Sequence, residues 1–337
     1  MKHNILWVGF GNFAKKLEPY VRECANAEIL YYYPDKNESI RRFGPKACWD
    51  IDDALGNPRV TSVFITTPNN RHGEYLKKAL AFEKHIFVEK PITATIDETA
   101  SLLPLMQQGK TVLMVGHNMR RQAAIRKTRK ILDSGQIGRI VSVHLNNSKG
   151  IAFSMDHTNW RFHEESHREG PLITVGIHLI DAMHYLFGPV DSVSAVIKNI
   201  SKKTEAPDSG SVLISLRSGA TVFLETNYNT PSEDIVSICG TEGSLYMNRG
   251  WLYCRQGRDI NRVPSNLNLV PLIPVDTLAE EIDEFFRAIE EGSRVETGYQ
   301  EALNALAVVE ACFQSHQNKR WVEIRNITEE YFQNKSA

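Results

Sequence analysis

The chain has 337 residues, 42% of them hydrophobic and 23% charged, with a formal net charge of −1. This length suits two domains, and the balanced charge argues against a nucleic-acid partner. No apolar run approaches the roughly 18 residues of a membrane-spanning helix, and we expect no signal peptide. Five scattered cysteines without Cys-x-x-Cys spacing favour reduced thiols in the cytoplasm over disulfides or a zinc ribbon.

The N-terminus predicts a strand over residues 5–8, a glycine-rich turn, and a helix over 15–24. The turn has the pattern G-x-G-x-x-A between strand and helix, which indicates dinucleotide binding. The first glycine permits the tight turn, the second admits a pyrophosphate, and the alanine permits close packing. Free N–H groups at the helix start would face the phosphates. The predicted cofactor-binding residues are Gly9, Phe10, Gly11, Asn12, Phe13 and Ala14.

A second strand is predicted over 28–33. An acidic residue about 20 positions after the last glycine of such a turn would hold the adenosine ribose and favour NAD. Asp35 fits this role, but Tyr33 lies equally near the expected position. In the second case Lys36 is close enough to meet the 2′-phosphate of NADP. The sequence leaves NAD and NADP both open.

Three further predicted strands, 60–66, 85–88 and 112–116, each end in a polar cluster, and helices are expected over 73–82 and 96–107. Alternating strands and helices predict a right-handed, doubly wound parallel sheet, whose ligand crevice lies outside the carboxyl ends of the strands. A lysine at the mouth of a buried strand is costly unless its charge is needed there. We therefore expect a dinucleotide and a lysine in one cleft, formed by Thr67, Pro68, Asn69, His72, Glu89, Lys90, His117, Asn118 and Arg120.

The second half predicts a helix over 121–133 and then a different pattern. Its alternating stretches indicate a largely antiparallel sheet with one face covered. They are residues 141–145, 192–196, 211–216, 221–226 and 235–239. Apolar helices are expected over 172–186 and 302–313, with a stripe of Ile282, Phe285, Phe286 and Ile289 between them.

The helix over 172–186 carries Thr174, His178, Asp181 and His184. Three interpretations remain open: a helix end that presents His178 to a substrate hydroxyl, a metal site, or a buried helix whose polar groups bond internally. We assign no metal, because thiolates and paired carboxylates are missing at ligand spacing. The histidines of the 156–167 loop are expected to be solvated.

The ordered motifs resemble those of the Gfo/Idh/MocA oxidoreductases, relatives of glucose–fructose oxidoreductase and inositol dehydrogenase. They are G-F-G-N-F-A at 9–14, T-P-N-N-R-H at 67–72, E-K-P at 89–91, G-H-N-M-R-R at 116–121, G-P-L-I-T-V-G-I-H-L-I-D at 170–181 and E-I-D-E-F-F-R-A-I-E-E-G at 281–292. The resemblance implies an NAD(P)-binding Rossmann domain over 1–120. It also implies a substrate-binding α/β domain over 121–337 with an open, mostly antiparallel sheet, the last helices being able to pack back on the first domain.

In activity, the resemblance implies NAD(P)-dependent hydride transfer on a sugar, sugar derivative or cyclitol by a cytoplasmic homodimer or homotetramer. Lys90 would touch nicotinamide ribose and substrate, and His178 would act as acid/base or orient the substrate. Pro68, Asn69 and His72 would line the cofactor. The substrate pocket would include His117, Asn118, Arg120, Trp160 and Arg161.

One departure from the family concerns Thr174, which stands where sugar dehydrogenases of the family commonly have aspartate four residues before the histidine. Threonine forms hydrogen bonds but carries no charge at neutral pH. We expect Lys90 to be the main proton-transfer residue, with His178 second and Thr174 assisting. Two rivals are a dinucleotide-binding regulatory protein without turnover and redox-assisted glycoside chemistry. The substrate itself is not specified by these motifs.

Overall fold

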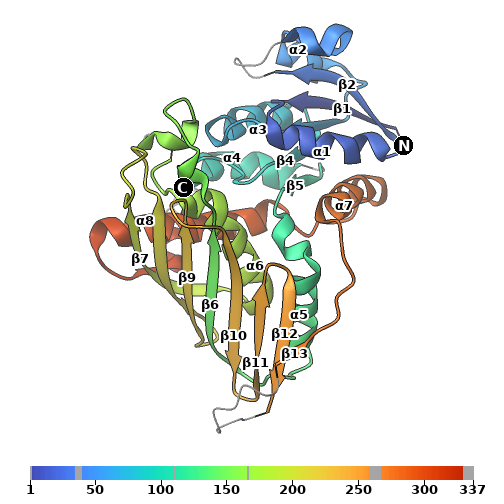
Figure 1. Ribbon diagram of the computed structural model, residues 1–337. Helices are drawn as coiled ribbons and strands as arrows, with labels where there is room; N and C mark the ends of the chain where they lie inside the picture. Colours follow the sequence, from blue (N-terminus) through green and yellow to red (C-terminus); the bar gives the residue numbers. More distant parts are fainter. Residues whose placement is uncertain (1, 35–39, 110, 165–166, 258–266, 329–337) are drawn as a thin grey trace. The chain divides into compact units, whose positions relative to one another are not determined.

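The computed structural model describes residues 2–34, 40–109, 111–164, 167–257 and 267–328 (Figure 1). The chain divides into two compact units. The first comprises Met1–Asn118 and Asp276–Leu303, and the second comprises Met119–Val275 and Asn304–Ala337.

The first unit contains a parallel sheet with the strand order β2-β1-β3-β4-β5. Its strands are β1 (His3–Val8), β2 (Ala27–Tyr33), β3 (Ser62–Ile65), β4 (His85–Val88) and β5 (Leu113–Val115). Its helices are α1 (Asn12–Glu23), α2 (Ile51–Gly56), α3 (His72–Ala81), α4 (Ile96–Gln108) and α7 (Thr277–Glu291), with short helical turns at Ile40–Lys46 and Asn69–Arg71. A further turn, Asn118–Arg121, runs from this unit into the second. The prediction of a doubly wound parallel sheet is confirmed, since β1 opens the chain and the order reverses beside it.

Helix α7 completes the core of this unit although it lies far along the chain. The carboxylate of Asp276 caps its start by accepting from two backbone N–H groups, and Gly292 ends it in the left-handed conformation. Its apolar stripe packs Phe285 against Phe64 and Phe87 of the sheet, with ring centroids 5.4 and 6.1 Å apart. Burying each aromatic ring stabilises the fold by about 1.5–3 kcal/mol.

The second unit contains a larger sheet with the strand order β13-β12-β11-β10-β6-β9-β8-β7-β14 in the described residues. Its strands are β6 (Ile140–Ser148), β7 (Val190–Lys198), β8 (Ser209–Leu216), β9 (Thr221–Asn227), β10 (Glu233–Gly240), β11 (Gly243–Asn248), β12 (Trp251–Gln256), β13 (Asn268–Leu269) and β14 (Val322–Glu323). Strand β6 pairs with β9 in parallel, and the other pairs are antiparallel. The predicted mostly antiparallel sheet is confirmed.

Helices cover one face of this sheet, with α5 (Ala123–Asp133) and α6 (Ile177–Phe187) on the same side of strands β6 and β12 (Figure 1). The unit also holds short turns at Ile151–Phe153 and Trp160–Phe162 and helix α9 (Ile324–Thr328), while α8 (Tyr299–Asn318) begins in the first unit. The opposite face carries exposed apolar side chains, among them Val196, Leu213 and Phe223.

Over the ranges that the structure describes, no helix is long and apolar enough to cross a bilayer. The same ranges hold no group of three or more His, Cys, Asp and Glu side chains placed to bind a metal ion. All five cysteines are free thiols.

Candidate functional site

The glycine turn between β1 and α1 is shaped for a close-lying ligand. Gly9 has φ +75° and donates its N–H to the carbonyl of Tyr33 at 2.9 Å. A Cβ on Gly9 would lie 2.6 Å from Cγ2 of Thr67, so only glycine fits there. A Cβ on Gly11 would meet no atom within 4 Å, and Gly11 caps α1 without a side-chain acceptor. A pyrophosphate can therefore approach the backbone at Gly11, next to the first N–H groups of α1, which have no partner within the helix.

Phe10 and Ala14 differ from the rest of the turn because their side chains belong to the core. Phe10 is 3% exposed and makes edge contacts with Trp7 and Tyr32, at centroid distances of 5.7 and 5.1 Å. Ala14 is fully buried. Their predicted role in cofactor binding is therefore limited to the backbone. Asn12 is exposed and Phe13 half-buried.

The end of β2 leaves the choice between NAD and NADP open. Tyr33 is half-buried and packs its ring against Tyr75, with centroids 5.9 Å apart. Asp35 and Lys36, the other residues of this prediction, lie outside the described residues.

The ends of β3 and β4 are joined through His72. Its ring is fully buried, with Nδ1 2.6 Å from the carbonyl oxygen of Pro91 and Nε2 2.9 Å from that of Thr67. Burial lowers the pKa of His72 despite these two carbonyl partners. Both ring nitrogens of His72 are engaged by backbone carbonyls, so this ring joins the two loops. The contact of His72 with the cofactor stays a prediction.

Two polar atoms beside His72 remain for a ligand. Oγ1 of Thr67 and Nδ2 of Asn69 are buried, and neither has a hydrogen-bond partner among the described residues. Pro68 lies between them and precedes the turn at Asn69–Arg71. Buried polar atoms in folded proteins nearly always have a partner. An open cradle at Gly11 next to two such atoms fits a dinucleotide.

The end of β4 holds the charged pair Glu89-Lys90, followed by a cis bond between Lys90 and Pro91. Glu89 is 8% exposed, and burial raises the pKa of its carboxyl to about 7 although the Lys90 charge acts the other way. A Cβ on Gly116 would lie 2.6 Å from Oε1 of Glu89, so the glycine after β5 gives this carboxyl its room. Lys90 is half-buried. Next along the chain, His117 is buried and Asn118 half-buried.

In the second unit, Thr174 lies in a π-helical turn, Leu172–Gly176, directly before α6. Such turns are frequent at functional sites. The Thr174 hydroxyl hydrogen-bonds to the hydroxyl of Tyr228, which also lies 3.1 Å from Nε2 of His167. Burial raises the pKa of the Tyr228 hydroxyl, against the neighbouring guanidinium of Arg161. His178, one helical turn after Thr174, is half-buried.

Trp160 and Arg161 belong to the same cluster. The expectation that the histidines of the 156–167 loop are solvated is wrong for His167, which is 1% exposed, whereas His157 is exposed. The guanidinium of Arg161 lies 4.2 Å from the centroid of the Trp160 ring, and that ring meets His167 edge-on at 5.3 Å. Tyr228 links these side chains to Thr174 and was missed by the sequence analysis, because one tyrosine after an apolar strand carries no motif.

Arg120 and Asp181 form a buried ion pair. Nε and Nη2 of Arg120 donate to the two carboxylate oxygens at 2.9 and 2.5 Å, and both side chains are nearly inaccessible. His184, one turn along α6 from Asp181, has its pKa lowered to about 4 by burial. For Asp181 and His184 the geometry therefore fits the buried-helix alternative. The substrate contact predicted for Arg120 stays a prediction.

Comparison of the sequence with models of known protein families assigns the chain to a family. Residues 3–117 match the family model described as an oxidoreductase family with an NAD-binding Rossmann fold, and residues 125–246 match the Gfo/Idh/MocA C-terminal domain. The chain belongs to the Gfo/Idh/MocA oxidoreductases. The predicted family and the predicted nicotinamide dinucleotide cofactor are thereby confirmed.

Individual Gfo/Idh/MocA proteins resemble this chain over most of its length. Levoglucosan dehydrogenase of Pseudarthrobacter phenanthrenivorans is 26% identical, over 86% of this chain and 87% of its own. D-xylose 1-dehydrogenase (NADP(+)) 2 of Haloferax volcanii is 23% identical, over 83% and 85%. A solved structure of levoglucosan dehydrogenase in complex with NADH and levoglucosan superposes with a TM-score of 0.87 at 24% identity, covering 96% of this chain and all of that one. That structural likeness shows the fold.

Proposed function

We propose that the protein is an NAD(P)-dependent oxidoreductase that transfers hydride to or from a hydroxyl-bearing carbon of a sugar, sugar derivative or cyclitol. The observation that carries the proposal is the row of close approaches between successive loops along one edge of the first sheet. Gly9 meets Thr67, His72 joins Thr67 to Pro91, and Glu89 meets Gly116. A dinucleotide cradle and a half-buried lysine thus share the carboxyl edge of the β1, β3, β4 and β5 strands.

When bound, the nicotinamide ring supplies or accepts the hydride. In the oxidative direction Lys90 accepts the proton of the substrate hydroxyl at Nζ, and in the reductive direction it donates one. His178 orients the same hydroxyl or takes the proton in its place. Thr174 carries no charge and contributes only through its hydroxyl, which is hydrogen-bonded to the hydroxyl of Tyr228.

The test of the proton-transfer role is Lys90→Ala, with Lys77→Ala on the exposed side of α3 as its control. We expect Lys90→Ala to lower turnover by a factor of about 100 to 10,000 while NADH and NADPH affinities, measured by calorimetry, stay nearly unchanged. Lys77→Ala should leave both quantities as they are. Unchanged turnover in the Lys90 variant would exclude the proton-transfer role.

A second candidate function is dinucleotide-dependent regulation without turnover, favoured by the uncharged Thr174 in the place of the family's common aspartate. Tight cofactor binding with no oxidation or reduction across a broad polyol panel would support it. Redox-assisted glycoside cleavage, the other alternative, would instead require the cofactor without consuming it.

For assembly and location we propose a cytoplasmic homodimer or homotetramer. The five free thiols support a reducing compartment. The exposed apolar side chains Val196, Leu213 and Phe223 on the open sheet face support an interface there. Light scattering of the purified chain distinguishes the monomer from both assemblies.

A further inference from the structure

A chain of three hydrogen-bonded side chains runs through the second unit from Thr174 to His167. The hydroxyl of Tyr228 stands in its middle, where it meets the Thr174 hydroxyl on one side and Nε2 of His167, 3.1 Å away, on the other. All three residues are buried. The ring of His167 lies at 12° to that of Tyr228 and meets Trp160 edge-on, so packing holds Nε2 toward the phenol.

The hydrogens at the Tyr228 hydroxyl allow this chain only two states. A phenol oxygen has one hydrogen to donate and two lone pairs with which to accept. Burial raises the pKa of Tyr228, against the charge and the hydrogen bond of the Arg161 guanidinium, so the phenol keeps its hydrogen. A guanidinium only donates, and it therefore takes one of the two lone pairs. One donor and one acceptor position remain, and His167 and Thr174 must occupy one each.

His167 decides between the two states. When its Nε2 carries no hydrogen, this nitrogen accepts from Tyr228, and Tyr228 accepts from Thr174. The Thr174 oxygen then offers only lone pairs to a further group. When Nε2 carries a hydrogen, every bond of the chain reverses. Tyr228 then donates to Thr174, and the hydrogen of Thr174 turns to a further partner. The direction of the Thr174 hydroxyl thus depends on a ring that lies two hydrogen bonds away.

A reversible hydroxyl at position 174 suits a reaction that interconverts a hydroxyl and a carbonyl. A substrate hydroxyl can donate a hydrogen, whereas the carbonyl formed from it can only accept one. The aspartate that is common at this position in the family carries only acceptors when it is ionised. Thr174 in this chain accepts from the hydroxyl in one state and donates to the carbonyl in the other, so it serves both directions of the reaction.

We propose that His167 and Tyr228 are positioning residues that set the direction of the Thr174 hydroxyl toward the reacting oxygen of the substrate. The proposal rests on the proposed function, because it takes the hydroxyl-bearing carbon from there. Lys90 and His178 keep their roles in proton transfer and orientation. The chain transfers no proton to the substrate: it supplies an acceptor for the hydroxyl and a donor for the carbonyl.

The surroundings of His167 make its hydrogen depend on this chain. The rings of Trp160 and Tyr228 pack against His167, and the guanidinium of Arg161 lies against both of them. Its charge disfavours a protonated imidazole. Glu169, two residues further along the chain, is buried, but its carboxylate accepts from the neighbouring arginine at 2.6 Å. A hydrogen on Nε2 therefore needs the Tyr228 oxygen as its acceptor.

The first test follows the imidazole of His167 by nitrogen-15 NMR between pH 5 and pH 9, in the cofactor-free protein, and does not depend on turnover. The protonated ring must carry a hydrogen on Nε2, which requires Thr174 to accept from Tyr228. Thr174→Val removes this acceptor and leaves a buried hydrogen bond unmade, so the midpoint of the His167 titration should fall by about one pH unit. Thr174→Ser keeps the hydroxyl and should keep the midpoint.

Thr226→Val is the matched control for this test. Thr226 is fully buried in the same unit, and its hydroxyl has no hydrogen-bond partner among the described residues. The same change of side chain there should leave the His167 titration as it is. The proposal is overturned by an unchanged midpoint in Thr174→Val or by an equal fall in Thr226→Val. It is also overturned if Nε2 of His167 carries no hydrogen anywhere in this pH range.

Turnover separates positioning from packing. Thr174→Val and Tyr228→Phe should each lower kcat about tenfold in both directions of the reaction, because each breaks the same chain of neutral hydrogen bonds. The double variant should lose no more than either single variant, since the chain can be broken only once. Thr174→Ser should recover most of the activity. Losses that multiply in the double variant would contradict the positioning role.

Failure of this proposal differs from failure of the proposed function. Full turnover of a sugar or cyclitol by Thr174→Val overturns the positioning role and leaves the oxidoreductase. A His167 titration that responds to Thr174→Val, in a protein without any oxidation or reduction, supports the hydrogen-bond coupling and overturns the oxidoreductase.

Discussion

Replacing Glu89 by glutamine should make the protein more stable at high pH. The folded protein raises the pKa of this buried carboxyl from 4.5 to about 7. Between these two values the folded state keeps a proton that the unfolded state releases, so the free energy of unfolding falls as the pH rises. Each pKa unit corresponds to 1.36 kcal/mol, which gives a total cost of about 3 kcal/mol above pH 7. Glutamine keeps the shape of the acid and carries no charge.

Urea denaturation of the cofactor-free protein at pH 5 and pH 8 measures this effect. Relative to wild type, Glu89→Gln should gain about 2.5 kcal/mol more at pH 8 than at pH 5, because part of the total is already lost at pH 5. Any constant packing cost of the amide cancels in that difference. Glu28→Gln is the control, because Lys2 lowers the pKa of this exposed carboxyl below 4.5 and its effect on stability therefore hardly changes between pH 5 and pH 8. Parallel stability curves for Glu89→Gln and wild type would refute the assignment of a buried, proton-holding Glu89.

Three further substitutions test the packing around the two sites, each by the free energy of unfolding. Gly9→Ala should cost about 3 kcal/mol and weaken NADH binding, whereas Gly135→Ala, also left-handed but in open space, should cost about 1 kcal/mol; equal costs would contradict the close approach. Asp181→Ala should cost about 3–5 kcal/mol because it leaves a buried guanidinium, against less than about 1 kcal/mol for the exposed pair member Asp133→Ala. Tyr228→Phe should cost about 1–3 kcal/mol through its lost hydroxyl contacts, and a neutral result would remove this residue from the Thr174 cluster.

The elements that the sequence predicted well are those whose apolar residues recur with a clear helical or strand period and are buried in the core. The strand predicted over 85–88 agrees with β4, and the helix over 96–107 agrees with α4 to one residue. Both are flanked by strong signals, such as the capping side chain of Thr95 before α4. Such local patterns decide the type of an element before any tertiary contact forms.

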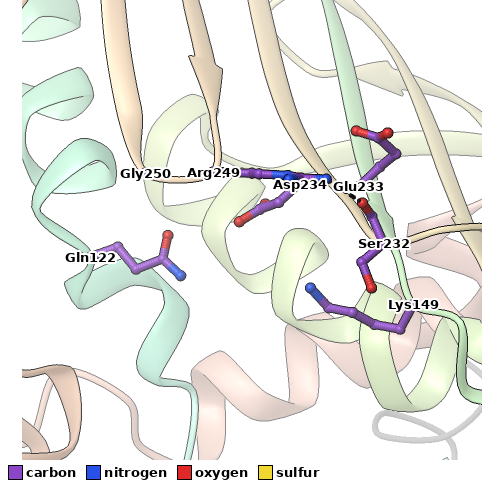
Figure 2. A pocket seen from close by; sticks show the side chains of 7 residues that line it. All are labelled: Gln122, Lys149, Ser232, Glu233, Asp234, Arg249 and Gly250. Atoms are coloured by element: carbon purple, nitrogen blue, oxygen red, sulfur yellow. Dashed lines mark hydrogen bonds between the residues drawn. The ribbon is translucent and has the colours of Figure 1, made fainter.

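The β11–β12 hairpin was missed because its turn chemistry is unusual. Arg249 and Gly250 both have positive φ, at +46° and +82°, the arrangement that asparagine-glycine pairs usually supply. An arginine in this conformation is uncommon. The same turn lines a pocket together with the end of β6 and the start of β10 (Figure 2), so the sequence analysis missed both together.

The site was predictable where a motif fixes a backbone shape and less so where side chains meet across the fold. Gly9 and Gly11 follow from the turn that they form. The engagement of Arg120 with Asp181, and of Thr174 with Tyr228, joins residues more than 50 positions apart, for which the local pattern holds no signal.

The first unit is formed by two separate segments of the chain, and this affects its folding during synthesis. Helix α7 supplies Phe285 and Phe286 to a sheet whose five strands have all been synthesised by residue 118. At about 5–20 residues per second, translation of the intervening segment takes on the order of ten seconds. During that time helix α7 is not yet present to pack on the aromatic side chains of Phe64 and Phe87. Nascent chains stalled in this interval should therefore be the ones that chaperones hold.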